Sequence, residues 1–279
     1  MPCIWGRFVH NSIMTDKTSS LSALSALPTE AMPHPEAWLD ALDDAAALRL
    51  MLASQAEAAQ AVSHAIPAIE MAARAMTAHL KANTTGRIIY AGAGTSARIG
   101  VQDGAELPPT FGWGQQRLAY MIAGGWQALL QAVEASEDNT KTALAEAKGL
   151  GICQADVVIG LSASGNTPYT VAALTAARQA KAVTIGIANN PDTALLRVAT
   201  YPILLATSGE VVAGSTRLKA ATAQKICLNM LSTLVMTRLG FVKHGLMRNL
   251  TPSNAKLNLR KQMIDSILAK TEAKKQGKA

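Results

Sequence analysis

Hydrophobic positions along the chain form short apolar runs that alternate with longer segments of helical spacing. Each run has the length of a buried strand, and strands that alternate with helices are typical of a parallel, doubly wound sheet. The sequence therefore predicts an α/β fold with a mostly parallel sheet. The expected strands are residues 88–91, 118–122, 156–161, 182–188 and 203–206.

Helical patterns precede, separate and follow these runs. Residues 38–80 are rich in alanine, and Pro67 marks an expected boundary between two helices, because proline disrupts a helix interior. The last helix of the α/β region is apolar on most faces, which indicates that it is buried. Further helices are expected at 126–133, from 142 to 147, at 169–180 and at 226–239.

The chain has 279 residues, 49% of them hydrophobic, which is enough for one substantial core. We expect one large domain with N-terminal and C-terminal helical extensions. Polar residues interrupt the most hydrophobic helix, so no membrane span is expected. The predicted division is an irregular arm at 1–35, N-terminal helices at 36–78, the α/β domain at 79–242 and a helical tail at 243–279.

Charge and cysteine usage limit the class of protein. The net charge is +7, but much of the excess lies near the C-terminus and only 4% of residues are aromatic, so nucleic-acid binding is not expected. Cys3, Cys153 and Cys227 have no CxxC spacing, and the histidines have no ligand spacing, which indicates a reducing cytoplasm and no metal site. The first residues lack a signal-peptide core, and we hypothesise that translation begins at Met14.

Two glycine-rich loops follow predicted strands and precede predicted helices. The first, GAGTSARIG, carries Thr95 and Ser96, and the second, SASGNTP, carries Ser162, Ser164 and Thr167. Glycine lets the backbone approach a ligand closely, and the helix that follows directs free N–H groups at an anion. Two such loops predict an anion cradle at the carboxyl edge of one sheet.

The loops fit a sugar phosphate better than a nucleotide. The first loop formally matches a dinucleotide fingerprint, but the second strand ends in Ala123-Gly124-Gly125 and offers no carboxylate for a ribose. No GxxxxGK[ST] occurs, which excludes a Walker loop. The alternative for Ser162 and Ser164 is that they only cap the helix that begins near Tyr169.

Two glutamates are candidates for proton transfer. Glu106 lies beside Leu107 and Pro108-Pro109 at an expected helix end, where partial burial would raise its pKa and make it a useful proton donor. Glu137 follows the Gly-Gly end of the second strand, where a ligand crevice opens. Two carboxylates in different environments divide acid and base work. The acidic residues expected to be structural are Asp103, Glu134 and Asp138.

Several motifs in order resemble the N-acetylmuramic acid 6-phosphate etherases of the sugar isomerase (SIS) domain superfamily. They are GAGTSARIGVQDGAELPPTFG, AVEASEDN, DVVIGLSASGNTPYTVAAL, TIGIANNP, GEVVAGSTRLKAATAQKICLNMLSTLVMTRLG and SNAKL, within residues 86–257. The resemblance implies an SIS-type three-layer sandwich. It also implies a cytoplasmic lyase that cleaves the D-lactyl ether of N-acetylmuramic acid 6-phosphate during cell-wall sugar recycling, without metal or cofactor.

The resemblance also implies roles for individual residues. It places the proton donor on Glu106 and the second acid or base on Glu137. In this chemistry a base removes the proton beside the open-chain aldehyde, an acid assists lactate departure, and water adds to the unsaturated intermediate. A homodimer with sites near the subunit interface is expected. The implied substrate-binding residues are Thr95, Ser96, Ser162, Ser164, Thr167, Ser215 and Lys219.

The chain departs from the family pattern at several positions. Ala97 replaces a glycine, Leu107 replaces a cysteine, and Pro33-His34-Pro35 stands where Arg-Asn-Pro is usual, although Thr29-Glu30 is kept. Ala53-Ser54-Gln55 stands where an acidic stretch is usual. The sequence also stops before the small helical domain that usually follows SNAKL. Two other functions stay open: a regulatory protein that senses a sugar phosphate, and an aldose-ketose phosphate isomerase.

Overall fold

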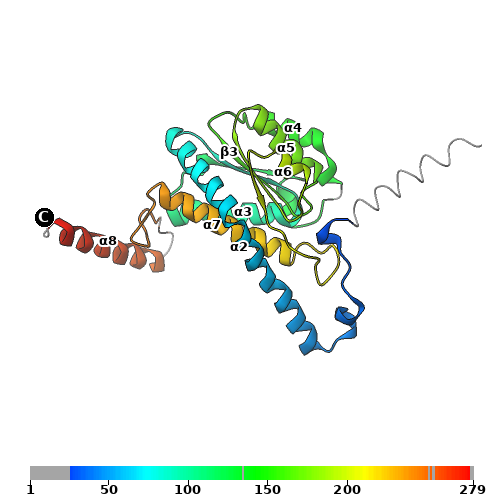
Figure 1. The fold of residues 1–279 in the computed structure, drawn as a ribbon. Coiled ribbons are helices and arrows are strands. Elements are labelled where there is room, and N and C mark those ends of the chain that lie inside the picture. Colours follow the sequence, from blue (N-terminus) through cyan, green and yellow to red (C-terminus); the bar gives the residue numbers. More distant parts are fainter. Residues whose placement is uncertain (1–25, 134, 251, 253–254, 277–279) are drawn as a thin grey trace, which may run out of the picture.

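The centre of the molecule is a five-stranded sheet in which every pair of neighbouring strands is parallel. The computed structural model describes residues 26–133, 135–250, 252 and 255–276. Strand order is β2-β1-β3-β4-β5 (Figure 1). The strands are β1 (Ile88–Gly92), β2 (Leu118–Ile122), β3 (Val157–Ser162), β4 (Val183–Ala188) and β5 (Tyr201–Leu204).

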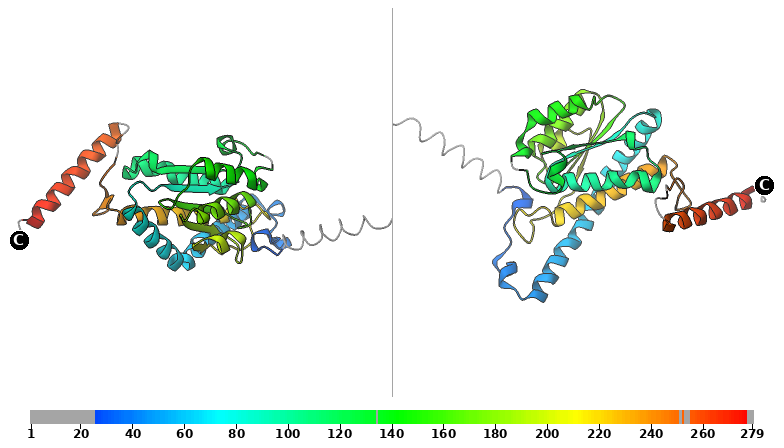
Figure 2. Two further views of the ribbon diagram at one scale, coloured as in Figure 1. Left: turned by 90° about the horizontal axis from the view of Figure 1, so that it is seen from above. Right: turned by 180° about the vertical axis from the view of Figure 1, so that it is seen from behind.

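Helices cover both faces of the sheet and make three layers (Figure 2). Alternate residues of a strand point to opposite faces, so Ile88 and Tyr90 of β1 join one core while Ile89 and Ala91 join the other. The predicted doubly wound α/β sandwich is confirmed. The first core contains α2 (Asp44–Ala82), α3 (Gly94–Phe111) and α7 (Lys219–Arg238); the second contains α4 (Thr140–Gly149), α5 (Pro168–Gln179) and α6 (Ala194–Val198).

Helix α2 is continuous through Pro67, so the predicted boundary between two helices at this proline is wrong. Pro67 is exposed, and water at that surface can take the hydrogen bond that the missing N–H leaves unmade. Ala65 and Ile69 on either side of it are buried in the core that α2 shares with α7. Tertiary packing therefore outweighs the local cost of the proline.

Two other helix predictions differ from the structure. Helix α3 does not stop at Pro108-Pro109 but runs to Phe111, because buried Leu107 and Phe111 anchor its last turn and Gly112 caps it in the left-handed region. The expected helix at 126–133 is only a 3-10 turn, Trp126–Leu129. Short strands β6 (Val242–Lys243) and β7 (Leu246–Met247) then precede α8 (Ala255–Gln276), which lies in the predicted helical tail.

Some positions named from the sequence lie outside the described residues: Cys3, Met14, Glu134 and the first two residues of SNAKL. Two short 3-10 turns, Pro28–Glu30 and Pro35–Ala37, are the first described elements of the N-terminal arm. Within the described part of the chain, no helix is both long and apolar enough to cross a bilayer.

Candidate active site

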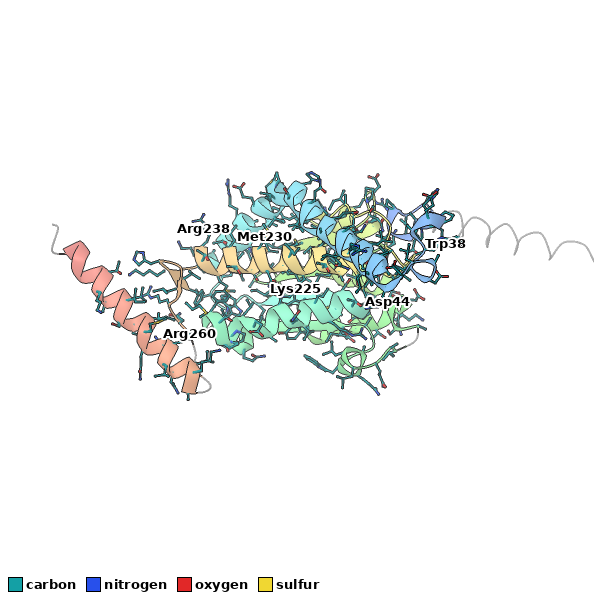
Figure 3. All side chains as sticks on the ribbon, turned by 90° about the horizontal axis from the view of Figure 1, so that it is seen from below. Trp38, Asp44, Lys225, Met230, Arg238 and Arg260 are labelled. Atoms are coloured by element: carbon teal, nitrogen blue, oxygen red, sulfur yellow. The ribbon has the colours of Figure 1, made fainter. Side chains whose placement is uncertain are left out.

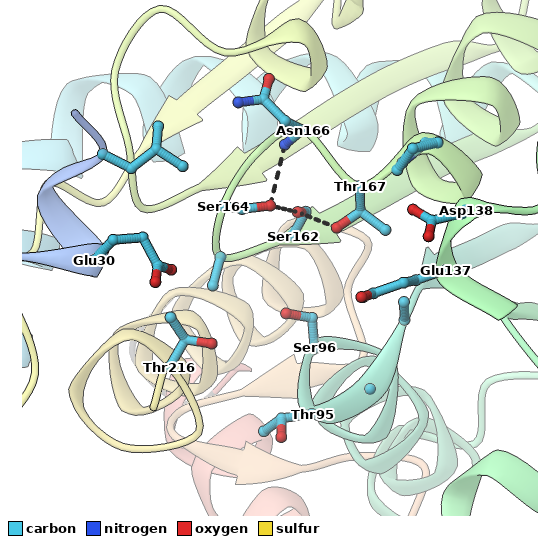
Figure 4. Close-up of a pocket in the computed structure, with 15 residues that line it drawn as sticks. Glu30, Thr95, Ser96, Glu137, Asp138, Ser162, Ser164, Asn166, Thr167 and Thr216 are labelled. Carbon is cyan, nitrogen blue, oxygen red and sulfur yellow. Dashed lines mark hydrogen bonds between the residues drawn. The ribbon is translucent and has the colours of Figure 1, made fainter. Parts of the chain in front are cut away.

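A polar cavity of about 550 Å³ lies at the carboxyl ends of β1 and β3 (Figure 4). These strands are neighbours, but the helix after β1, α3, covers one face of the sheet and the helix after β3, α5, covers the other. A crevice opens where helices leave in opposite directions, which is where open α/β sheets bind ligands. Six hydroxyl side chains line it: Thr95, Ser96, Ser162, Ser164, Thr167 and Thr216.

The loop after β3 holds its hydroxyls in one network. The Ser162 hydroxyl lies 2.8 Å from Thr167 Oγ1 and 3.2 Å from Ser164 Oγ, and it accepts a hydrogen bond from the Gly165 N–H at 3.0 Å. The Asn166 N–H donates to Ser164 Oγ at 3.3 Å. The loop is thus organised before a ligand arrives, which lowers the entropic cost of binding.

Gly165 is required by this loop for two reasons. Its φ of +72° lies in the left-handed region, which is costly for residues with a β-carbon. A β-carbon here would also lie 2.4 Å from Thr193 Oγ1, closer than any real contact. The sequence predicted that glycine here lets the backbone approach a ligand. In the structure Gly165 instead lets this loop pack closely against Thr193.

The N-termini of two long helices face the cavity. Helix α3 begins at Gly94, and its first residues, Thr95 and Ser96, line the cavity. Helix α5 begins at Pro168, which also lines it. Neither helix has a side-chain cap, so its first N–H groups are available to a ligand. Together with the hydroxyls, these groups can bind an anion such as phosphate.

The structure places Glu137 at this cavity. It lies in the 3-10 turn Ser136–Asp138 between β2 and α4, and its neighbour Asp138 lines the cavity too. The turn is fixed at both ends, since Ser136 Oγ donates to the Val133 carbonyl at 2.7 Å and Asn139 Oδ1 caps α4 by accepting from the Thr142 N–H at 3.0 Å. Glu137 is exposed, so its carboxylate is open to a ligand and to water.

Glu106 does not lie at the same cavity. It follows Ser96 by ten residues on α3, which at 1.5 Å per residue separates their backbones by about 15 Å along the helix. Glu106 is exposed, so the expectation that it is partly buried is wrong for the single chain. The cause is that α3 continues through both prolines with Leu107, not Glu106, on its buried face. One chain therefore brings Glu137 to the hydroxyls and leaves Glu106 away from them.

Two other predicted binding residues are also not among those that line the cavity. Ser215 precedes the lining residue Thr216. The side chain of Lys219 is 1% exposed, and its ammonium donates hydrogen bonds to Glu57 of α2 at 2.7 Å and to Ser208 at 2.6 Å. This hydrogen bond lowers the pKa of Glu57 against the opposing effect of burial. Lys219 thus links α7 to α2 in this structure.

Asp103, predicted to be structural, is buried between α3 and α7. Its carboxylate accepts hydrogen bonds from Tyr90 Oη at 2.8 Å and from Ser232 Oγ at 3.0 Å, with Asn229 Nδ2 at 3.4 Å. Burial raises the pKa of Asp103, although the hydrogen bonds oppose that shift. Glu106 lies three residues further, on a neighbouring part of the same helix surface. Asp103 therefore fixes the orientation of the helix that carries Glu106.

Sequence reasoning missed Glu30 and Thr216 as residues of the cavity. Glu30 comes from the N-terminal arm and Thr216 from the loop before α7, and both line the cavity (Figure 4). The only signal for Glu30 was the retained Thr29-Glu30 pair, in an arm that departs from the family pattern at Pro33-His34-Pro35. Its distance in sequence from the glycine loops gives no indication that they meet.

Comparison with known proteins places this geometry in context. Residues 70–178 match the model of the glucokinase regulatory protein N-terminal SIS domain, and residues 147–234 match the SIS domain model. The N-acetylmuramic acid 6-phosphate etherase of Streptomyces coelicolor is 43% identical over 87% of this chain and 78% of its own length. The enzyme of that name from Halalkalibacterium halodurans is 43% identical over 86% of this chain and 80% of its own length.

Among solved structures, a phosphoheptose isomerase from Francisella tularensis has a TM-score of 0.54. The likeness covers 70% of this chain and all of that one, at 18% sequence identity. At such low identity it shows the shared fold and nothing about the reaction.

Proposed function

The chain belongs to the N-acetylmuramic acid 6-phosphate etherase family, and on this premise we propose that it cleaves the D-lactyl ether of N-acetylmuramic acid 6-phosphate. The products are N-acetylglucosamine 6-phosphate and D-lactate. The observation that carries the proposal is the cavity at β1 and β3, in which six hydroxyls and two helix N-termini lie beside the carboxylate of Glu137. A phosphate site next to a general base is what this reaction needs.

The phosphate binds through hydroxyls and backbone N–H groups. No lysine or arginine is among the described residues that line the cavity, so neutral donors and helix dipoles supply the attraction. The loop at residues 162–167 and the start of α3 face each other across the cavity and form the two sides of the cradle (Figure 4). The sugar then extends toward the carboxylates at the cavity rim.

In the proposed reaction the carboxylate of Glu137 removes the proton at C2 of the open-chain sugar, next to the aldehyde. Elimination breaks the C3–O bond, a proton donor protonates the departing lactate oxygen, and a C2–C3 double bond forms. Water then adds its hydroxyl to C3 while C2 regains a proton, which gives the product. The family resemblance implies the donor role for Glu106 and an acid or base role for Glu137, and we assign the base role to Glu137.

This assignment requires a second copy of the chain. Glu106 lies about 15 Å along α3 from Ser96, which is farther than a glutamate side chain reaches. A homodimer in which α3 of one chain approaches the cavity of the other would bring the two carboxylates together. In a two-fold dimer the arrangement repeats, so both cavities would be completed in the same way.

An apolar surface on α2 and α7 supports the dimer. Ile66 and Met71 of α2 and Met230 of α7 are 48%, 60% and 39% exposed. A groove of about 560 Å³ lies between the two helices and is lined by Ile66, Met230 and Leu234. Helix α3 lies next to α7, so this surface is close to the helix that carries Glu106 (Figure 3). Exposed apolar surface of this kind marks interaction sites.

The proposed function is tested by incubating the purified chain with N-acetylmuramic acid 6-phosphate and identifying the products. We expect equal amounts of D-lactate and N-acetylglucosamine 6-phosphate. Binding without any product would favour a sugar-phosphate sensor, and interconversion of an aldose and a ketose phosphate would favour an isomerase. The cytoplasmic location inferred from the cysteines stays a prediction.

A further inference from the structure

Glu30 lies in the cavity opposite Glu137, and the reaction described above gives it no role. In Figure 4 the two carboxylates stand on opposite sides, with the hydroxyls of Ser162, Ser164 and Thr167 between them. Glu30 belongs to the 3-10 turn Pro28–Glu30, and it and the nearby Leu27 are far in sequence from the other residues that line the cavity. It is half-buried, so its position is defined while its carboxylate remains accessible.

The turn that carries Glu30 is fixed by one buried amide. Thr29 is completely buried, its N–H donates to Asn190 Oδ1 at 3.1 Å, and its hydroxyl accepts from Asn190 Nδ2 at 2.9 Å. The same Nδ2 group lies 3.3 Å from the Ala163 carbonyl and 3.4 Å from the Ser164 carbonyl. Asn190 therefore connects the arm to the hydroxyl loop and sets the position of Glu30 relative to it.

The loop before α7 leaves room for the Glu30 carboxylate. A β-carbon at Gly214 would lie 2.7 Å from Glu30 Oε2, so only glycine fits without displacing the carboxylate. Gly214 also has a φ of +69°, which favours glycine. The Thr29–Asn190 hydrogen bonds and the space left by Gly214 thus define where the carboxylate lies, while it stays accessible.

The chemistry of this position follows from its charge. An ionised carboxylate only accepts hydrogen bonds and repels phosphate, so Glu30 must face a part of the ligand that offers O–H or N–H groups. We propose that Glu30 is a substrate-contacting residue that accepts hydrogen bonds from the hydroxyl or acetamido groups of the sugar while the phosphate lies among the cavity hydroxyls. This inference rests on the proposed function and adds a specificity-determining residue to it.

The test compares two ligands and two variants by calorimetric titration. Glu30→Ala is compared with Glu36→Ala, a matched control because Glu36 belongs to the next turn of the same arm and its side chain is 90% exposed. The ligands are N-acetylglucosamine 6-phosphate and inorganic phosphate. We expect Glu30→Ala to weaken binding of the sugar phosphate by about tenfold to a hundredfold, while phosphate binding is unchanged or tighter and the control matches the wild type.

The inference is overturned if Glu30→Ala binds the sugar phosphate as well as the wild type does, or if both ligands lose affinity equally, which would indicate a collapsed cavity. If Glu30→Ala does not fold, the same titrations of Glu30→Gln test the inference, because glutamine keeps the shape of the side chain and removes its charge. We expect Glu30→Gln to weaken binding of the sugar phosphate and to leave binding of inorganic phosphate unweakened. Failure of the proposed function is a separate result: the wild type would bind the sugar phosphate in a Glu30-dependent way and release no D-lactate.

Discussion

Gly165 is the residue on which the geometry of the hydroxyl loop depends most directly. We expect Gly165→Ala to lower the free energy of unfolding by more than about 1 kcal/mol, because it adds strain at positive φ and a clash with Thr193. Affinity for inorganic phosphate should fall as well, since the Gly165 N–H holds Ser162 in place. Thermal unfolding and calorimetric titration measure the two effects.

Gly149→Ala is the control for this variant. Gly149 ends α4 at ordinary φ, and a β-carbon there would meet nothing within 4 Å. Alanine is a better helix former than glycine, so Gly149→Ala should be neutral or slightly stabilising. Equal stability of the two variants would show that the loop tolerates a β-carbon and would contradict its described packing.

Among individual residues, the sequence predicted those that follow strands directly. Thr95, Ser96, Ser162, Ser164 and Thr167 all line the cavity, because a loop after a parallel strand has to emerge at the same edge of the sheet. Residues brought in from other parts of the chain could not be placed this way. Thr216 was missed, and Lys219 is not among the lining residues, because the positions of both depend on how the loop before α7 packs.

At the scale of elements, an ion pair joins the starts of β1 and β3. Arg87 donates from Nε to Asp156 Oδ1 at 3.1 Å and from Nη2 to Oδ2 at 2.7 Å, and the Arg87 and Cys153 N–H groups also donate to Asp156. Burial by itself would raise the pKa of Asp156, but these hydrogen bonds hold it below its ordinary value. The Arg87–Asp156 ion pair, called the clamp below, therefore holds β1 and β3 in register.

Removal of this clamp should change stability in a pH-dependent way. Because the folded pKa of Asp156 is lowered, its contribution is complete above the unfolded pKa, about 4, and is lost as pH falls through the folded value. Asp156→Asn should cost about 3–5 kcal/mol at pH 7. Its deficit against the wild type should shrink as the pH falls below about 4. Urea unfolding at several pH values measures this.

Glu70→Gln is the control for the clamp. Glu70 pairs with Arg74 on the surface of α2 at 2.6 Å, with side chains that are 58% and 79% exposed. Such an exposed pair contributes about 0–1 kcal/mol. A deficit of Asp156→Asn that stayed constant from pH 7 to pH 3, or that matched the small effect of Glu70→Gln, would contradict the role given to the clamp.

The sequence predicted these elements well where a local pattern decides them. Each of the five expected strands has a counterpart in the sheet, because each is a short apolar run that ends in a turn signal. The errors at Pro67 and at residues 126–133 have tertiary causes. Packing of α2 in the core it shares with α7 keeps a helix through a proline, and the segment after β2 forms only a short 3-10 turn before the loop that carries Glu137.

At the scale of the whole molecule, the separation of Glu106 from the cavity predicts complementation between two inactive variants. Glu106→Gln and Glu137→Gln should each release little D-lactate. Mixed, refolded dimers contain one cavity with both natural carboxylates, so activity should recover to about a quarter of the wild-type value if subunits exchange at random. A mixture that stays inactive although mixed dimers form would show that the second copy does not supply Glu106.

Met230→Asp tests whether the apolar groove between α2 and α7 forms the dimer interface. A charge in the centre of the apolar groove should oppose docking, because an unpaired buried carboxylate is costly. We expect this variant to sediment as a monomer with the stability of a folded chain and to lose D-lactate release. A variant that stays dimeric and active would place the interface elsewhere on the molecule.

The most direct measurement of the central claim is the rate of D-lactate release from N-acetylmuramic acid 6-phosphate by the wild type and by Glu137→Gln. The account predicts release by the wild type and a fall in kcat of about a hundredfold or more in the variant, with binding of N-acetylglucosamine 6-phosphate retained. Unchanged release by Glu137→Gln, or no release by a wild type that binds the sugar phosphate, would contradict it.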